Sequence, residues 1–210
     1  DPAQGRFASE MGLVFRLFAP PRPPTAQGRV VLHVSLEDDT PVAAPEWFAH
    51  VVRADDAVYV CQPRGIGETR WGRRTPPSRI ERACALVGTT VDTGRVRDIA
   101  AAAAYLHARH PERELVISGE GSAGILGAYA ALFEHGIQHV VMVRPPATHM
   151  DPAAPQFLNL LRVCDVPGML GLLAPRPLTL IEPPRDLPAP VRAIYAAAEA
   201  GDRLTIEAMP

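Results

Sequence analysis

Short apolar runs alternate with longer mixed segments along most of the chain. Each run is rich in β-branched residues and too short for a buried helix, which predicts a strand. The predicted strands are RVVLHVSL (29–36), AVYVCQ (57–62), ELVIS (114–118), HVVMV (139–143), PLTLIE (177–182) and RLTIEA (203–208). Because these runs are almost continuously apolar, both faces of the sheet should be covered, as in a parallel sheet.

The segments between the strands carry apolar residues at helical spacing. The predicted helices are 45–53, 94–108, 123–134, helical pieces within 155–173, and 191–200. Asp92 or Thr93 is placed to cap the second of these helices, and Gly136 is placed to end the third. Strands alternating with helices predict an α/β fold, a doubly wound and mostly parallel sheet in three α/β/α layers. Right-handed crossovers place ELVIS at its centre, flanked by AVYVCQ and HVVMV.

The length of 210 residues suits one domain whose core needs no disulfide or metal to hold it. We assign residues 28–210 to this domain and residues 1–27 to an N-terminal extension or linker. Cys61, Cys84 and Cys164 lack C-x-x-C spacing and are expected to be small buried hydrophobes. We therefore expect neither a metal nor a cofactor.

The net charge of −2, without a basic run, argues against partners such as nucleic acid or an anionic membrane surface. No stretch approaches the roughly 18 apolar residues of a membrane span. The first residue is Asp, so the natural N-terminus is not shown. A soluble protein is expected, and the compartment stays open: a secreted or periplasmic protein whose signal has been removed is compatible with the sequence.

Four segments resemble the acetyl xylan esterase-like branch of the α/β-hydrolases, and they occur in that group's order. They are QPRGIGETRW (62–71), VGTTVDTGRVRDIAAAAAYL (87–106), SGEGSAGILGAYAAL (118–132) and LLAPRPLTLIEP (172–183). The resemblance runs from about Gly28 to the end of the chain. It implies a serine on a sharp strand-to-helix turn that attacks an acyl carbonyl. It also implies an acid after the penultimate strand, a histidine after the last strand, and backbone N–H groups that hold the oxyanion.

The expected nucleophile turn departs from this pattern. In such a tight turn the positions two before and two after the nucleophile must be small. Counted from Gly121 these positions are Gly119 and Ala123, whereas counted from Ser122 one of them is Glu120. We therefore expect Gly121 at the nucleophile position, with the positive φ that glycine adopts without strain. The alternative is Ser122 as a displaced nucleophile.

The other two members of the triad are also in question. Glu182 and Asp186 both follow the strand PLTLIE, and either could be the triad acid or simply a solvated carboxylate. None of the seven histidines follows the last predicted strand. His149, after the fourth strand, is the only stand-in, although a structural role competes with that of a base. Without a base, a serine hydroxyl is a poor nucleophile near neutral pH.

The turn after the first strand, where the oxyanion is expected to bind, is acidic. It reads Ser35, Leu36, Glu37, Asp38 and Asp39. Three carboxylates near a developing negative charge would destabilise the transition state. This turn therefore argues against ester hydrolysis.

Three functional hypotheses follow. The first is a non-catalytic α/β-hydrolase-like domain, structural or ligand-binding, whose partner is the remainder of a larger esterase-related polypeptide. The second is an active carboxylic-ester hydrolase, an acetyl esterase using Ser122 with a histidine from outside the chain. The third is a cleft that binds a carbohydrate or its ester, lined by Arg64, Glu68, Arg70 and Trp71.

Overall fold

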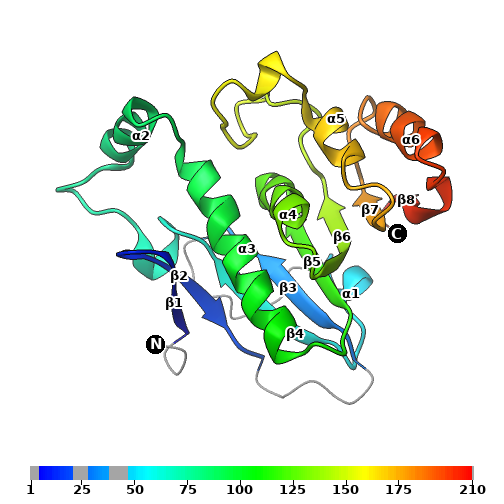
Figure 1. The fold of residues 1–210 in the computed structure, drawn as a ribbon, viewed down its shortest axis with the longest axis horizontal. Coiled ribbons are helices and arrows are strands. Elements are labelled where there is room, and N and C mark those ends of the chain that lie inside the picture. Colours follow the sequence, from blue (N-terminus) through cyan, green and yellow to red (C-terminus); the bar gives the residue numbers. More distant parts are fainter. Residues whose placement is uncertain (1–4, 21–27, 38–46, 210) are drawn as a thin grey trace.

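A computed structural model describes residues 5–20, 28–37 and 47–209, which build one eight-stranded sheet (Figure 1). The strands are β1 (Arg6–Glu10), β2 (Leu13–Phe18), β3 (Val30–Val34), β4 (Ala57–Gln62), β5 (Leu115–Glu120), β6 (Ile137–Val143), β7 (Leu178–Ile181) and β8 (Leu204–Glu207). Their order across the sheet is β1-β2-β4-β3-β5-β6-β7-β8. The six strands from β4 to β8 pair in parallel, and β2 joins β4 antiparallel.

Helices cover both faces of this sheet, which confirms the predicted α/β class. They are α1 (Phe48–Val51), α2 (Pro77–Leu86), α3 (Val91–Arg109), α4 (Ser122–Phe133), α5 (Val166–Gly171) and α6 (Pro188–Ala197), with 3₁₀ turns at Gly67–Thr69, Leu160–Arg162 and Gly201–Arg203. The larger hydrophobic cluster packs α3, α4, α5 and α6 on one face (Figure 1). The smaller cluster lies on the other face, around Trp47 and Phe48 at α1. None of the described helices is long and apolar enough to cross a membrane.

Strand β5 lies in the interior of the sheet, as predicted, but one of its expected neighbours is wrong. It pairs with β6 on one side and with β3, not β4, on the other. The reason is the long connection from β4 to β5, which holds α2 and α3 and can pass over β3. The chain therefore runs from β3 to β4 on one side and from β5 to β6 on the other. Such a reversal opens a crevice at the carboxyl ends of β3 and β5.

The N-terminal region predicted as an extension or linker contributes two strands to the sheet instead. Residues 1–4 and 21–27 lie outside the described part, but β1 and β2 form a hairpin that continues the sheet beyond β4. Phe7 stacks on Phe15 with ring centroids 5.7 Å apart, and it also contacts Tyr105 of α3 at 4.8 Å. Burial of these aromatic side chains against α3 explains why the hairpin belongs to the domain.

Helix boundaries differ from the predictions where polar side chains decide them. Helix α3 begins before residue 94 because the Thr90 side chain accepts a hydrogen bond from the Thr93 N–H at 3.0 Å, so Thr90 is the cap. The Asp92 carboxylate pairs with Arg95 at 3.0 Å instead. Of the short helix predicted over 45–53, residues 45 and 46 lie outside the described part.

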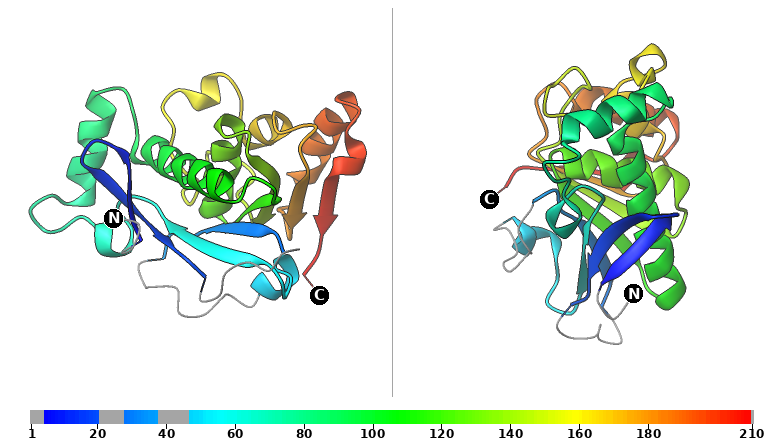
Figure 2. Two further views of the ribbon diagram at one scale, coloured as in Figure 1. Left: turned by 60° about the horizontal axis from the view of Figure 1, so that its bottom comes forward. Right: turned by 90° about the vertical axis from the view of Figure 1, so that its left-hand side faces the viewer.

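Helix α2 was not predicted at all. None of its ten residues is buried. It stands at the end of the molecule beside the β1–β2 hairpin, away from the helices that cover the sheet (Figure 2). The segment does carry a helical signal, with a proline in the first turn and Ile80 and Cys84 four residues apart on one face, and this signal was missed.

Candidate active site

The turn from β5 to α4 brings strand and helix so close that two of its positions accept only glycine. A Cβ on Gly119 would lie 2.6 Å from the backbone of Ala123, and one on Gly124 would lie 2.8 Å from the Gly119 carbonyl oxygen. Gly121 forms the apex, with φ 55° and ψ −125°. A Cβ at Gly121 would meet no atom within 4 Å. A side chain at this position would therefore project freely, at the cost of a strained backbone.

Ser122 is the first residue of α4, and its hydroxyl does not cap the helix. Its Oγ donates to the carbonyl oxygen of Ala153, in the loop between β6 and α5. The hydroxyl proton is therefore directed at a backbone carbonyl, which cannot act as a general base. Ser122 nevertheless lines a cavity of about 500 Å³, called the elbow cavity below.

His149, the candidate base, is held in the same loop by both ring nitrogens. Nδ1 lies 2.9 Å from the carbonyl oxygen of Pro155, and Nε2 lies 2.5 Å from the Tyr129 hydroxyl. Because a carbonyl only accepts, Nδ1 carries the proton and Nε2 accepts from the tyrosine. Burial raises the pKa of Tyr129, which keeps this hydroxyl a donor.

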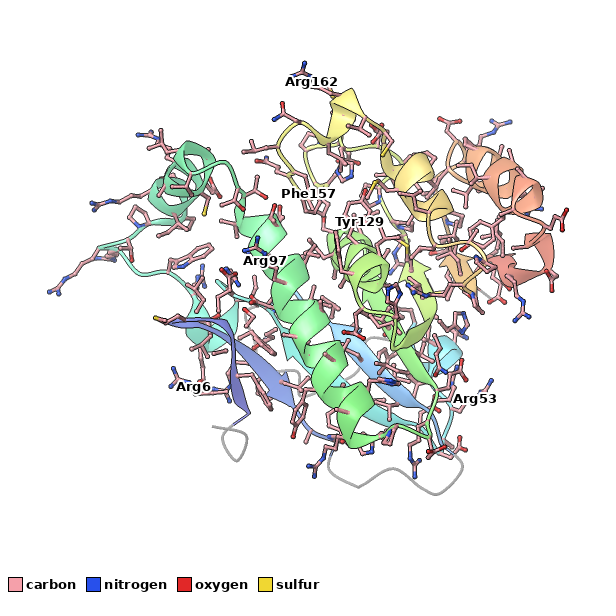
Figure 3. All side chains as sticks on the ribbon, in the orientation of Figure 1. Arg6, Arg53, Arg97, Tyr129, Phe157 and Arg162 are labelled. Atoms are coloured by element: carbon pink, nitrogen blue, oxygen red, sulfur yellow. The ribbon has the colours of Figure 1, made fainter. Side chains whose placement is uncertain are left out.

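The ring of His149 also packs edge-on against Phe157, with centroids 5.6 Å apart. Figure 3 labels Tyr129 and Phe157, which meet between α4 and the loop that passes over it. The main-chain N–H of His149 donates to Asp165 at 2.8 Å. This set of contacts anchors the loop to α4 and does not bring His149 to Ser122.

The two candidate acids have different surroundings. Asp186 is exposed, before α6. Glu182 follows β7 with φ 48° and forms an ion pair with Arg144 at 2.8 Å. Arg144, with φ 46°, also pairs with Glu120 at 2.5 Å. Glu120 in turn accepts a hydrogen bond of 2.8 Å from the Trp47 indole N–H.

Glu120, Arg144 and Glu182 thus form a row along the carboxyl ends of β5, β6 and β7. Both hydrogen-bonded carboxylates raise the pKa of Arg144, so the arginine stays charged. Sequence reasoning missed Arg144, although its place directly after a predicted strand marks it as a residue of this edge. Glu182, a candidate triad acid, is thus paired with an arginine and not with a histidine.

The acidic turn after β3 is described only as far as Glu37, so Asp38 and Asp39 lie outside the described residues. The Glu37 side chain is exposed, and the backbone N–H of Glu37 donates to the Ser35 hydroxyl at 3.2 Å. Its carbonyl oxygen accepts from the Gln62 amide at 2.9 Å. Leu36 contributes to the wall of the elbow cavity.

The four residues expected to line a carbohydrate cleft divide between two neighbouring cavities. Arg70 and Trp71 line the elbow cavity together with Ser122 and Arg95. Arg64 and Glu68 line a second cavity, and Trp71 borders both. The structure therefore brings only two of the four to the elbow.

The sheet order and the sharp turn after β5 define the fold of the α/β-hydrolase superfamily, and this chain has that fold. The sequence matches no protein-family model and no curated protein. Solved structures match at low identity. A candidate acetyl xylan esterase from Bacteroides fragilis matches with TM-score 0.66 and 13% identity, over 97% of this chain and 65% of that protein. The chain thus spans somewhat less than two thirds of that neighbour.

Two further solved structures share the fold. Est1E from Butyrivibrio proteoclasticus, solved with ferulic acid bound, matches with TM-score 0.59 and 12% identity, over 98% of this chain and 88% of that protein. A family 15 glucuronoyl esterase from Caldicellulosiruptor kristjansonii matches with TM-score 0.57 and 12% identity, over 93% and 66%. At these identities the likeness establishes the fold.

Proposed function

We propose that this chain is a non-catalytic domain of the α/β-hydrolase fold and part of a larger esterase-related polypeptide. The observation that carries the proposal is the glycine at the apex of the turn between β5 and α4. Gly121 has the positive φ of that apex but no side chain to attack a carbonyl.

Three further features support the loss of ester hydrolysis. The Ser122 hydroxyl donates to a carbonyl, His149 uses both ring nitrogens within its loop, and Glu182 pairs with Arg144. A serine needs an adjacent base to attack an ester at a useful rate near neutral pH. None of these contacts supplies one to Ser122.

The test is active-site titration of the purified chain with a chromogenic acetate and a fluorophosphonate probe. We expect no stoichiometric burst, no stoichiometric labelling, and the same background rate in Ser122→Ala. Gly121→Ser should stay unlabelled, and Gly121→Ala is its matched control because it adds the same backbone strain without a hydroxyl. A burst or a label that disappears in Ser122→Ala would overturn the proposal.

The second candidate is a carboxylic-ester hydrolase that uses Ser122. It is favoured by one observation, the position of Ser122 on the wall of the elbow cavity. Attack would require the Ser122 hydroxyl to leave the Ala153 carbonyl and to reach a base. The titration above distinguishes the two candidates, because only this one predicts a label that depends on Ser122.

A further inference from the structure

A second cavity, called the α2 cavity below, lies between α2, the β1–β2 turn and the loop after β4. Its volume is about 460 Å³. Its apolar wall is formed by Leu13 and Val14 of β2, Trp71 after β4, and Ile80 and Cys84 of α2. A concave site of this size, mostly apolar with a few polar groups, has the features of a small-molecule pocket.

Helix α2 separates this cavity from the elbow cavity. Ile80 and Cys84, four residues apart on one face of the helix, line the α2 cavity. Pro77, Glu81 and Ala85, on the neighbouring face, line the elbow cavity. The two cavities are therefore adjoining but distinct, and side chains on α2 can block one without the other.

Trp71 completes the partition. Its indole ring lies against the backbone of Gly65, where a Cβ would come within 2.6 Å of the ring, and Gly65 has φ 77°. The close approach fixes the ring as a flat apolar surface on the cavity wall.

Arg64 supplies the polar group of the α2 cavity. It pairs with Asp98, whose side chain has no exposed area, at 2.7 Å, and with Glu10 at 2.8 Å. Within the described part of the chain, Arg64 donates hydrogen bonds from its backbone N–H, Nε and Nη2, and its carbonyl oxygen accepts one from Arg95. Nη1 lies beside Gly94 of the cavity wall, at 2.6 Å from where a Cβ would be. The two N–H groups of Arg64 Nη1 remain available as donors.

The charges around the cavity determine which acceptor these donors can bind. Arg64 and Arg97 face Glu10 and Asp98, so two positive charges offset two negative ones. Arg6, the remaining arginine of the lining, has an interaction partner of its own. Glu68 pairs with Arg16 in the same way. Figure 3 labels Arg97, which comes to the rim of the cavity from α3. A ligand that carries its own charge would lose its hydration at a site whose charged side chains already have partners.

We propose that the α2 cavity binds an uncharged, mainly apolar small molecule whose carbonyl or hydroxyl oxygen accepts a hydrogen bond from Arg64 Nη1. The flat apolar part of the ligand packs on Trp71. Ile80 and Cys84, both partly buried, close the site from α2, and such a ligand would bury them further. The site goes beyond the proposed loss of ester hydrolysis and does not depend on it.

The test compares two planar probes of equal size by isothermal titration calorimetry. Naphthalene-2-carboxamide is neutral and offers a carbonyl oxygen, whereas naphthalene-2-carboxylate is an anion of the same shape. We expect the amide to bind with a dissociation constant of about 0.1 mM, within reach of a ligand of its size. The carboxylate should bind at least about tenfold more weakly. Equal or tighter binding of the carboxylate, or no binding of the amide at millimolar concentration, would overturn the proposal.

Matched variants locate the site. Cys84→Trp fills the α2 cavity and should weaken amide binding at least about tenfold. Ala83→Trp, exposed on the same helix and outside both cavities, should not change it. Leu158→Trp obstructs the elbow cavity only and should also leave binding unchanged. Binding that survives Cys84→Trp but is lost in Leu158→Trp would place the ligand in the elbow cavity and contradict the proposal.

A second pair of variants keeps the test decisive if Cys84→Trp does not fold. Leu13→Trp blocks the α2 cavity from the hairpin, and Met11→Trp, at a fully exposed neighbouring position, is its control. Circular dichroism of each variant establishes that it is folded. If Leu13→Trp binds the amide as tightly as Met11→Trp, the proposed site is wrong.

Discussion

Helices α2 and α4 have similar lengths but opposite relations to the core. Nine of the twelve residues of α4 are buried, and its glycines allow close contact with β5. None of the ten residues of α2 is buried, and the helix is flanked by Gly72 and Gly88, where a Cβ would meet nothing within 4 Å. Packing therefore fixes the turn at Gly121 as part of the core. Helix α2 can open or unfold on its own at little cost to the rest of the protein.

The same substitution in the two helices should give the largest contrast. Leu126→Ala removes a fully buried side chain of α4 and should lower the free energy of unfolding by about 2–5 kcal/mol. Leu86→Ala, on α2 at 88% exposure, should change it by less than about 0.5 kcal/mol. Urea unfolding curves measure both. Similar losses for the two variants would show that α2 is packed in solution.

Acid should weaken the core and spare α2. Burial, opposed by a contact with Ser118 and by the charge of Glu120, lowers the pKa of His33 from 6.5 to about 4. Between these pH values the unfolded chain binds a proton that the folded protein excludes. The free energy of unfolding therefore falls as the pH drops from 6.5 to 4, by about 3 kcal/mol in total, and this contribution is constant outside that window.

Stability measured by urea unfolding across this pH range tests the prediction. His33→Gln should flatten the dependence, because glutamine does not titrate. His50→Gln, at an exposed position, is the control and should leave the slope unchanged. An unaltered slope in His33→Gln would assign the acid sensitivity to other groups.

Two glycines with positive φ allow a closer comparison. Gly121 at the start of α4 has φ 55°, and Gly88 after α2 has φ 77°; neither crowds a neighbour. Alanine at either position should introduce roughly 1–3 kcal/mol of backbone strain. Gly121→Ala should lower the global free energy of unfolding by this amount. Gly88→Ala should leave it unchanged and speed hydrogen exchange in α2 alone, because that helix can relax locally. A global loss in Gly88→Ala would contradict the independence of α2.

The smallest effects should come from exposed charges beside either helix. Glu182→Gln breaks one ion pair of Arg144, whose side chain is 44% exposed, and should cost less than about 0.5 kcal/mol. Glu81→Gln on α2 should cost as little. Thermal unfolding of both variants at low and high salt measures this. A larger, salt-dependent loss in Glu182→Gln would give the row of charges after β5, β6 and β7 a structural role.

The two helices also show what the sequence could predict. The spacing of small residues around Gly121 predicted the backbone angle found at the apex, because that constraint is local and steric. Strand β4 has the bounds predicted for AVYVCQ, since a buried strand gives a continuous apolar signal. Helix α2 carries a shorter signal, Ile80 and Cys84 on one face of a mostly polar segment, and it was missed because no long apolar stripe accompanies it.

The local spacing of residues could not predict contacts between distant segments. The pairing of Arg144 with Glu120 and Glu182 depends on which strands are neighbours and where each ends. The hairpin of β1 and β2 shows alternation too short to distinguish from a linker. The position of β3 between β4 and β5 likewise follows from a long crossover whose path local spacing does not define.

The close contact of the Trp71 ring with Gly65 has a spectroscopic consequence. The chain has two tryptophans, Trp71 beside α2 and Trp47 hydrogen-bonded to Glu120 next to the turn before α4. Trp47 is 3% exposed, so its emission should be blue-shifted and resist acrylamide quenching. Trp71 is only half-buried and should emit at longer wavelength and be quenched readily. The protein thus carries one intrinsic fluorophore in each of the two regions, and their signals can be followed separately without a label.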